Sequence, residues 1–145
     1  MEHSHPESYI KLALSATLHC LTGCGLGDVI GMTIGLTIGF SYYESIFTGI
    51  VFGSILGYLF GIFPLLKRQI DLQKATKIVL TTELISIVFM ELGEAITEVF
   101  SPGMRKAGPL HESYWLGLLF VLLVGFLAAL PVNLLLVRKG IRHQH

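Results

Sequence analysis

Four glutamates lie inside a stretch of chain that is otherwise apolar enough to cross a membrane. They are Glu83, Glu91, Glu94 and Glu98. A carboxylate in hydrocarbon costs about 2.5–3.5 kcal/mol even on the insertion scales that give the lowest values. Four of them on one predicted helix therefore need a compensating arrangement, such as bound cations, bound protons or a water-filled cavity.

An earlier apolar segment carries candidate partners for these acids. Cys20, Cys24, Asp28 and Met32 follow one another at steps of four, and His19 precedes the first of them. On an α-helix, each step of four advances about 40° around the axis and about 6 Å along it, so these side chains form a slowly winding stripe. Thiol, thioether and imidazole groups favour Cu(I) or zinc, whereas carboxylates favour harder cations.

The helix that carries the glutamates is predicted to have two unlike faces. Its four acids and Met90 fall within an arc of about 100°. The opposite side is purely apolar and consists of Leu80, Leu84, Val88, Phe89, Leu92, Ile96 and Val99. We therefore expect the acidic face to turn towards the rest of the protein and the apolar face to contact lipid.

Together these two segments predict a graded cation site, with sulfur donors on one side and carboxylates in the centre. The preferred ligands are Cys20, Cys24, Asp28, Glu91 and Glu94, and the second choices are His19, Met90 and Glu98. The expected ion is a transition-metal cation, copper first and zinc second, which the protein would bind or translocate. Without a cation, several of the glutamates are expected to be protonated, because like charges repel strongly in a medium of low dielectric constant.

Two other functions stay open. The carboxylates alone could conduct protons or monovalent cations, with the cysteines serving only as small packing residues. Alternatively, the chain could be a non-catalytic accessory subunit of a larger membrane metalloenzyme or respiratory complex, since its predicted loops are short. The sequence carries no activated nucleophile, phosphate-binding loop or haem-attachment motif, so we do not expect an enzyme.

Composition predicts an all-α integral membrane protein with a single domain over residues 1–145. The chain is 52% hydrophobic and only 14% charged, whereas soluble domains carry roughly 25% charged residues. A crossing needs about 20 apolar residues. Four stretches are long enough, which predicts a four-helix bundle: Leu12 to Phe40, Ser45 to Leu66, Ile78 to Phe100 and Tyr114 to Val137. No basic stripe or motif suggests a nucleic-acid partner.

The basic residues predict the orientation of this bundle. With four crossings, both termini share one side of the membrane with the middle loop. That side holds eight of the ten basic residues, and only Arg105 and Lys106 lie on the other. The positive-inside rule therefore places both termini in the cytoplasm. The first residues lack a basic region and a cleavage site, so no signal peptide is expected.

Glycine recurs every fourth residue on the first two predicted helices. The first series is Gly23, Gly27, Gly31, Gly35 and Gly39, and the second is Gly49, Gly53, Gly57 and Gly61. Small residues at this spacing let two helix backbones approach closely. The pattern predicts a tightly packed hairpin or a seam between two copies in a homo-oligomer.

Two motifs also resemble a known family. They are Leu18-His19-Cys20-Leu21-Thr22-Gly23-Cys24-x-Leu26-Gly27-Asp28 and, much later, Met90-Glu91-Leu92-x-Glu94. This pattern is similar to that of an uncharacterised family of small prokaryotic four-helix membrane proteins that carries a domain-of-unknown-function label. The resemblance covers nearly the whole chain. It implies a multi-pass protein of the prokaryotic plasma membrane, with polar signature residues on the first and third helices and no established activity.

Overall fold

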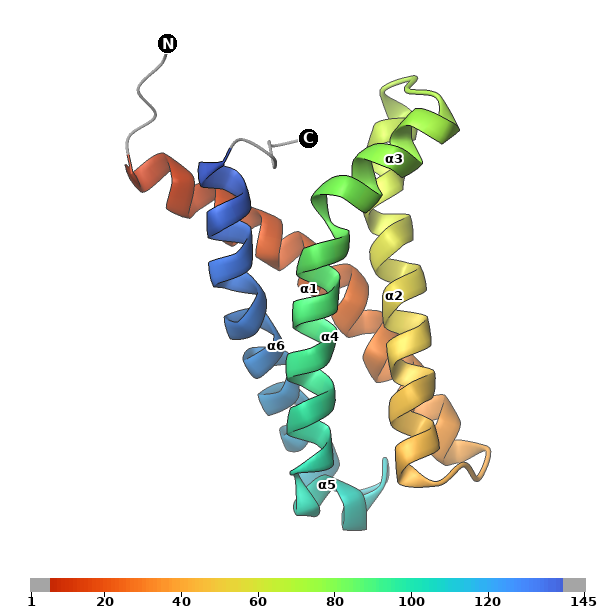
Figure 1. Cartoon of the computed structure of the whole chain (residues 1–145). Coiled ribbons are helices and arrows are strands. Elements are labelled where there is room, and N and C mark those ends of the chain that lie inside the picture. Colours follow the sequence, from red (N-terminus) through yellow and green to blue (C-terminus); the bar gives the residue numbers. More distant parts are fainter. Residues whose placement is uncertain (1–5, 140–145) are drawn as a thin grey trace.

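A computed structural model describes residues 6–139 of the chain, which form six helices and no strand. In chain order they are α1 (Pro6–Thr37), α2 (Tyr42–Lys67), α3 (Leu72–Thr82), α4 (Leu84–Val99), α5 (Pro102–Ala107) and α6 (Glu112–Arg138). The prediction of an all-α protein is confirmed for this part of the chain. The described chain starts and ends at the end of the structure that also holds the α2–α3 turn (Figure 1). The termini themselves lie outside the described residues.

Three of the helices are long and apolar enough to cross a membrane. They are the part of α1 from Tyr9 to Thr37, the whole of α2 and the whole of α6. At about 1.5 Å per residue, each is longer than the roughly 30 Å hydrocarbon core of a bilayer. The prediction of a membrane protein is supported for these three segments. The second and fourth predicted segments, 45–66 and 114–137, lie inside α2 and α6.

The third predicted segment, 78–100, is not one helix, and this expectation was wrong. Helix α3 already begins at Leu72, where the Asp71 carboxylate accepts a hydrogen bond of 3.2 Å from the backbone N–H of Gln73. The helical run is interrupted at Glu83, whose φ of −113° departs from helical values, and α4 begins at Leu84. Figure 1 shows α3 bent away from α4 and lying over α2. Helix α4 alone has 16 residues, or about 24 Å, which is shorter than the hydrocarbon core.

Glu83 makes a tertiary contact at this break. The Glu83 side chain is 4% exposed, and its carboxylate lies directly against Gly61 of α2. An apolar pattern continues smoothly through this position, so the hydropathy of the sequence predicts no interruption there.

The first predicted segment ends at Thr37 and not at Phe40. Gly39 has a φ of +98°, and the backbone N–H of Phe40 donates to the carbonyl oxygen of Gly35 at 2.9 Å. This is the hydrogen bond with which a left-handed glycine typically ends a helix. No atom lies within 4 Å of where a Cβ of Gly39 would be. The expectation that Gly39 belongs to a packing series was therefore wrong, because this glycine terminates α1.

The most extensive helix contact in the described chain is the one between α1 and α2. A Cβ added to Gly27 would lie 2.6 Å from the backbone nitrogen and Cα of Gly53, and one added to Gly31 would lie 2.9 Å from the Cα of Gly49. At these positions the two backbones touch, with no room for a side chain between them. Helix α4 packs chiefly against α6 and makes smaller contacts with α2 and α1.

The two faces of the stretch from Leu80 to Val99, which spans the end of α3 and the whole of α4, are as unlike as expected. All seven residues of the predicted apolar face are exposed on the surface, from 40% for Val99 to 54% for Leu92. Met90 and the four acids are buried in the interior. A surface of this composition is suited to lipid and not to water.

Candidate cation site

Helices α1 and α4 bring three carboxyl groups together in the middle of the protein. Asp28, Glu91 and Glu94 each offer an oxygen, and these oxygens all lie within 4.8 Å of one another. Metal–oxygen bonds in proteins measure about 2.0–2.6 Å, so oxygens on opposite sides of one ion can be about 5 Å apart. The three side chains are 1%, 6% and 1% exposed. The group is therefore buried and compact enough to enclose one cation.

These carboxyl groups lack hydrogen-bond donors. Both oxygens of Asp28, Glu91, Glu94 and Glu98 are buried and accept no hydrogen bond from any described residue. Glu98 lies beside Asp28, close enough for the two groups to share one hydrogen bond if either is protonated. Buried charges in proteins are normally paired or coordinate a metal. This part of the interior therefore needs positive charge, as protons or as a cation.

The two cysteines form a second group next to the acids. The Sγ atoms of Cys20 and Cys24 are 3.8 Å apart, and both residues are buried and form no disulfide. Two thiolates on a tetrahedral zinc ion, with bonds of about 2.3 Å, are about 3.8 Å apart. Met90 belongs to the same buried cluster and is 0% exposed, so its thioether could add a third soft donor for Cu(I).

The predicted ligands thus fall into two neighbouring groups. Neither thiol belongs to the compact group of three acids, although Cys24 is near enough to Glu91 and Glu94 to interact electrostatically with both. His19 is part of neither group. Its Nε2 lies 3.1 Å from the carbonyl oxygen of Phe60 on α2, and its ring packs on that phenyl ring. The histidine faces α2 because it belongs to the same stripe of α1 as the glycines.

Glycines on neighbouring helices make the space for these donors. A Cβ on Gly53 of α2 would collide with Oε1 of Glu91. One on Gly125 of α6 would lie 2.5 Å from both Cγ and Oε1 of Glu94. The acids of α4 therefore reach between α2 and α6 only because these two positions carry no side chain. Sequence reasoning missed this role. The only signal was weak: Gly125 and Ala129 are two small residues spaced four apart in a long apolar helix.

Sequence reasoning also missed a polar contact between α1 and α6. The Asn133 side-chain amide donates to Oγ1 of Thr17 at 2.9 Å, and both residues are 0% exposed. The signal was a lone asparagine in a long apolar helix. A buried side-chain hydrogen bond of this kind holds two membrane helices in one register.

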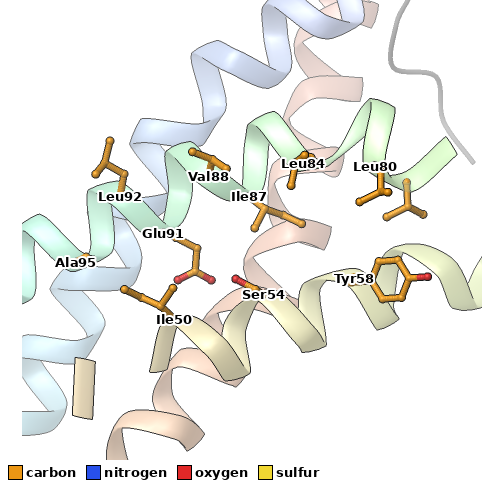
Figure 2. Close-up of a pocket in the computed structure, with 11 residues that line it drawn as sticks. Ile50, Ser54, Tyr58, Leu80, Leu84, Ile87, Val88, Glu91, Leu92 and Ala95 are labelled. Atoms are coloured by element: carbon orange, nitrogen blue, oxygen red, sulfur yellow. The ribbon is translucent and has the colours of Figure 1, made fainter. Parts of the chain in front are cut away.

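One side of the site opens towards the surface through a groove between α2 and α4. Figure 2 shows the Glu91 carboxylate pointing across it towards Ile50 and Ser54. The groove has a volume of about 450 Å³. Apart from Glu91, Ser54 and Tyr58, its lining is apolar: Ile50, Val79, Leu80, Leu84, Ile87, Val88, Leu92 and Ala95.

We expect this groove to let a hydrophobic carbodiimide reach Glu91. In detergent or vesicles, dicyclohexylcarbodiimide should modify Glu91 well before Glu94 or Glu98, which do not line the groove. A water-soluble carbodiimide should leave Glu91 unmodified, because the path is apolar. Peptide mass spectrometry measures the site and extent of labelling. Equal labelling of all three glutamates would contradict the proposed access. Labelling of a neighbouring residue that persists in Glu91→Gln would contradict it as well.

The profile of a family described as Domain of unknown function (DUF4396) matches residues 11–142. The matched region includes every candidate ligand described above. No curated protein and no solved structure matches the chain significantly.

Proposed function

The chain belongs to the DUF4396 family, and for this member we propose a multi-pass membrane protein that binds or translocates a transition-metal cation. Copper is the first choice and zinc the second. The hard donors are Asp28, Glu91 and Glu94, with Glu98 beside them. The soft donors are Cys20, Cys24 and Met90. The protein acts as a binding or transport protein and not as an enzyme.

The proposed topology has four crossings, with α3 and α4 together making the third. The stretch from Leu72 to Val99 is helical except at Glu83, so α3 and α4 follow each other directly. Both termini are cytoplasmic by the positive-inside rule, in the plasma membrane of a prokaryote. The glycines of α1 and α2 form the packing seam of the first hairpin, and the His19-Cys20 motif is the family signature. The expected homo-oligomer or larger complex stays a prediction.

One observation carries the metal proposal: eight buried carboxylate oxygens without a donor lie next to a pair of buried thiols. A cation supplies the positive charge that the described side chains do not. The thiols provide the affinity for a soft metal that carboxylates lack. A cation that passes from one group to the other exchanges sulfur ligands for oxygen ligands, so it is held tightly at the first and more loosely at the second.

Elemental analysis tests this function. Protein purified in mild detergent from cells supplied with copper and zinc should contain bound metal at a fixed ratio to protein. The Cys20→Ser, Cys24→Ser double variant should lose most of its copper while it stays folded, because serine keeps the size of the side chain and removes the soft donor. Metal-free wild-type protein, or unchanged copper in the double variant, would disprove the metal proposal.

A second candidate is a conduit for protons or monovalent cations. It is favoured by the fact that the compact three-donor group contains only carboxylates. In proteoliposomes this candidate predicts a cation flux that persists in the double serine variant and stops in Glu94→Gln. The role as an accessory subunit stays a prediction, which stoichiometric co-purification of partner proteins would support.

A further inference from the structure

Helix α2 contributes neither an acid nor a thiol to the site, yet it touches four polar side chains in a row. Each of its four buried glycines lies against one of them. In order along the helix, Glu83 lies on Gly61, Cys24 on Gly57, Glu91 on Gly53 and Asp28 on Gly49. The glycines are four residues apart, so consecutive contacts are separated by about 6 Å.

Gly27 and Gly31 of α1 differ from Gly57 and Gly61 of α2. A Cβ on Gly27 or Gly31 would meet the backbone of α2, which is what close packing of two helices requires. A Cβ on Gly57 would instead collide with the Cys24 thiol alone. Its next neighbour, Cδ1 of Ile87, would be at an ordinary 3.5 Å. The space above Gly57 is therefore filled by the thiol and by no other group at close range.

We propose that the α2 glycines are positioning residues that hold the donors of the cation site in a single row, and that Glu83 is a further member of this row. The inference rests on the proposed function and adds a path to it. Donors about 6 Å apart divide the path of a cation into short steps from one ligand to the next. A side chain at any of these four glycine positions would displace the donor that lies against it.

Glu83 forms the end of the row nearest the α2–α3 turn. It is 4% exposed and lies at the break between α3 and α4, which brings its carboxylate onto Gly61. Asp28 forms the other end, where Glu98 adjoins it. The row thus leads from the bend in α3–α4 through the thiol to the compact group of acids. Two of its members, Asp28 and Glu91, are among the buried carboxylates without a donor.

A double-mutant cycle tests the positioning role without any assumption about function. Gly57→Ala should lower the midpoint of thermal unfolding in detergent by about 4 °C or more, because the new methyl group meets the Cys24 sulfur. In the presence of Cys24→Ala, the same Gly57→Ala change should have little effect, since the sulfur is gone. An equal loss in both backgrounds, or no loss in either, would overturn the positioning role.

Two controls sharpen this result. Gly103→Ala should not shift the midpoint, because no atom lies within 4 Å of the added Cβ. Gly61→Ala should also lower the midpoint of thermal unfolding, and Glu83→Ala should remove most of this loss. The reason is that the nearest atoms to a Cβ of Gly61 are those of the Glu83 carboxylate. Failure of this second rescue would remove Glu83 from the row.

Binding of Cu(I) tests the consequence for the site. Competition with a chromophoric Cu(I) chelator should show affinity at least about tenfold weaker in Gly57→Ala than in the wild type, and wild-type affinity in Gly103→Ala. Transfer of Cu(I) into proteoliposomes should be slower in Glu83→Gln at unchanged bound stoichiometry. Unchanged affinity in Gly57→Ala and an unchanged rate in Glu83→Gln would overturn the path. If the wild type binds no Cu(I), the proposed function fails and the path fails with it, whereas the double-mutant cycle still decides the positioning role.

Discussion

Gly27→Ala is expected to destabilise the protein more than any other single glycine-to-alanine change on α1 or α2. A Cβ at this position would meet the carbonyl oxygen of Phe52 and the backbone of Gly53. Backbone atoms cannot rotate away as the end of a side chain can, so the helices must separate along their length. Overpacking of this kind costs about 3 kcal/mol at the upper end of its usual range.

Reversible unfolding in mixed detergent micelles, followed by circular dichroism, measures this loss of stability. The matched control is Gly103→Ala, whose added methyl group meets no atom within 4 Å. No truncation of a side chain should rescue Gly27→Ala, in contrast to the rescue expected at Gly57. A Gly27→Ala protein as stable as the wild type would show that α1 and α2 do not pack through their backbones here.

Glu94→Met is expected to change stability and cation binding in opposite directions. The Glu94 oxygens are buried, lack a donor and lie beside two other acids. Replacing such a group by an apolar side chain of similar volume removes the desolvation penalty and the repulsion, and should raise the free energy of unfolding of the metal-free protein by about 1–4 kcal/mol. The same change removes one of the three oxygen ligands, and cation affinity should fall by about 100-fold.

Unfolding of the metal-free protein measures the change in stability, and a cation titration measures the change in affinity. Both are performed on the wild type and on Glu94→Met. Glu112→Met is the control, because Glu112 lies exposed in the first turn of α6, and neither quantity should change by much. A Glu94→Met protein that is less stable than the wild type would mean that the carboxyl group has a stabilising partner. Unchanged affinity would remove Glu94 from the ligand set.

The membrane character and helical class of this protein could be predicted from local sequence alone. Long apolar stretches must bury their backbone hydrogen bonds within helices when they enter lipid. The face of α4 that carries the acids could also be predicted, because spacing on a helix determines which side chains share a direction. Burial of Glu91 and Glu94 followed from the same argument, since charged groups are excluded from contact with lipid.

Other features of the fold and the site depend on contacts between residues of different helices, which the local sequence does not contain. At the break between α3 and α4, Glu83 contacts Gly61, which is distant in sequence. His19 has the right chemistry for a ligand but faces Phe60. The positions of glycine predicted close packing, but their spacing could not reveal that Gly27 and Gly31 lie closest to backbone whereas the buried glycines of α2 lie closest to polar side chains.

By itself, the sequence determined that this chain is an all-helical membrane protein with acids and thiols held away from lipid, because periodicity and hydropathy are properties of each helix alone. Only the tertiary structure decided which donors meet. It brought Asp28, Glu91 and Glu94 together, left the thiols as a neighbouring group and placed glycines against these donors. The physical reason is that the rotation and register of one helix against another are set by close packing of all their side chains at once, and no single helix carries that information.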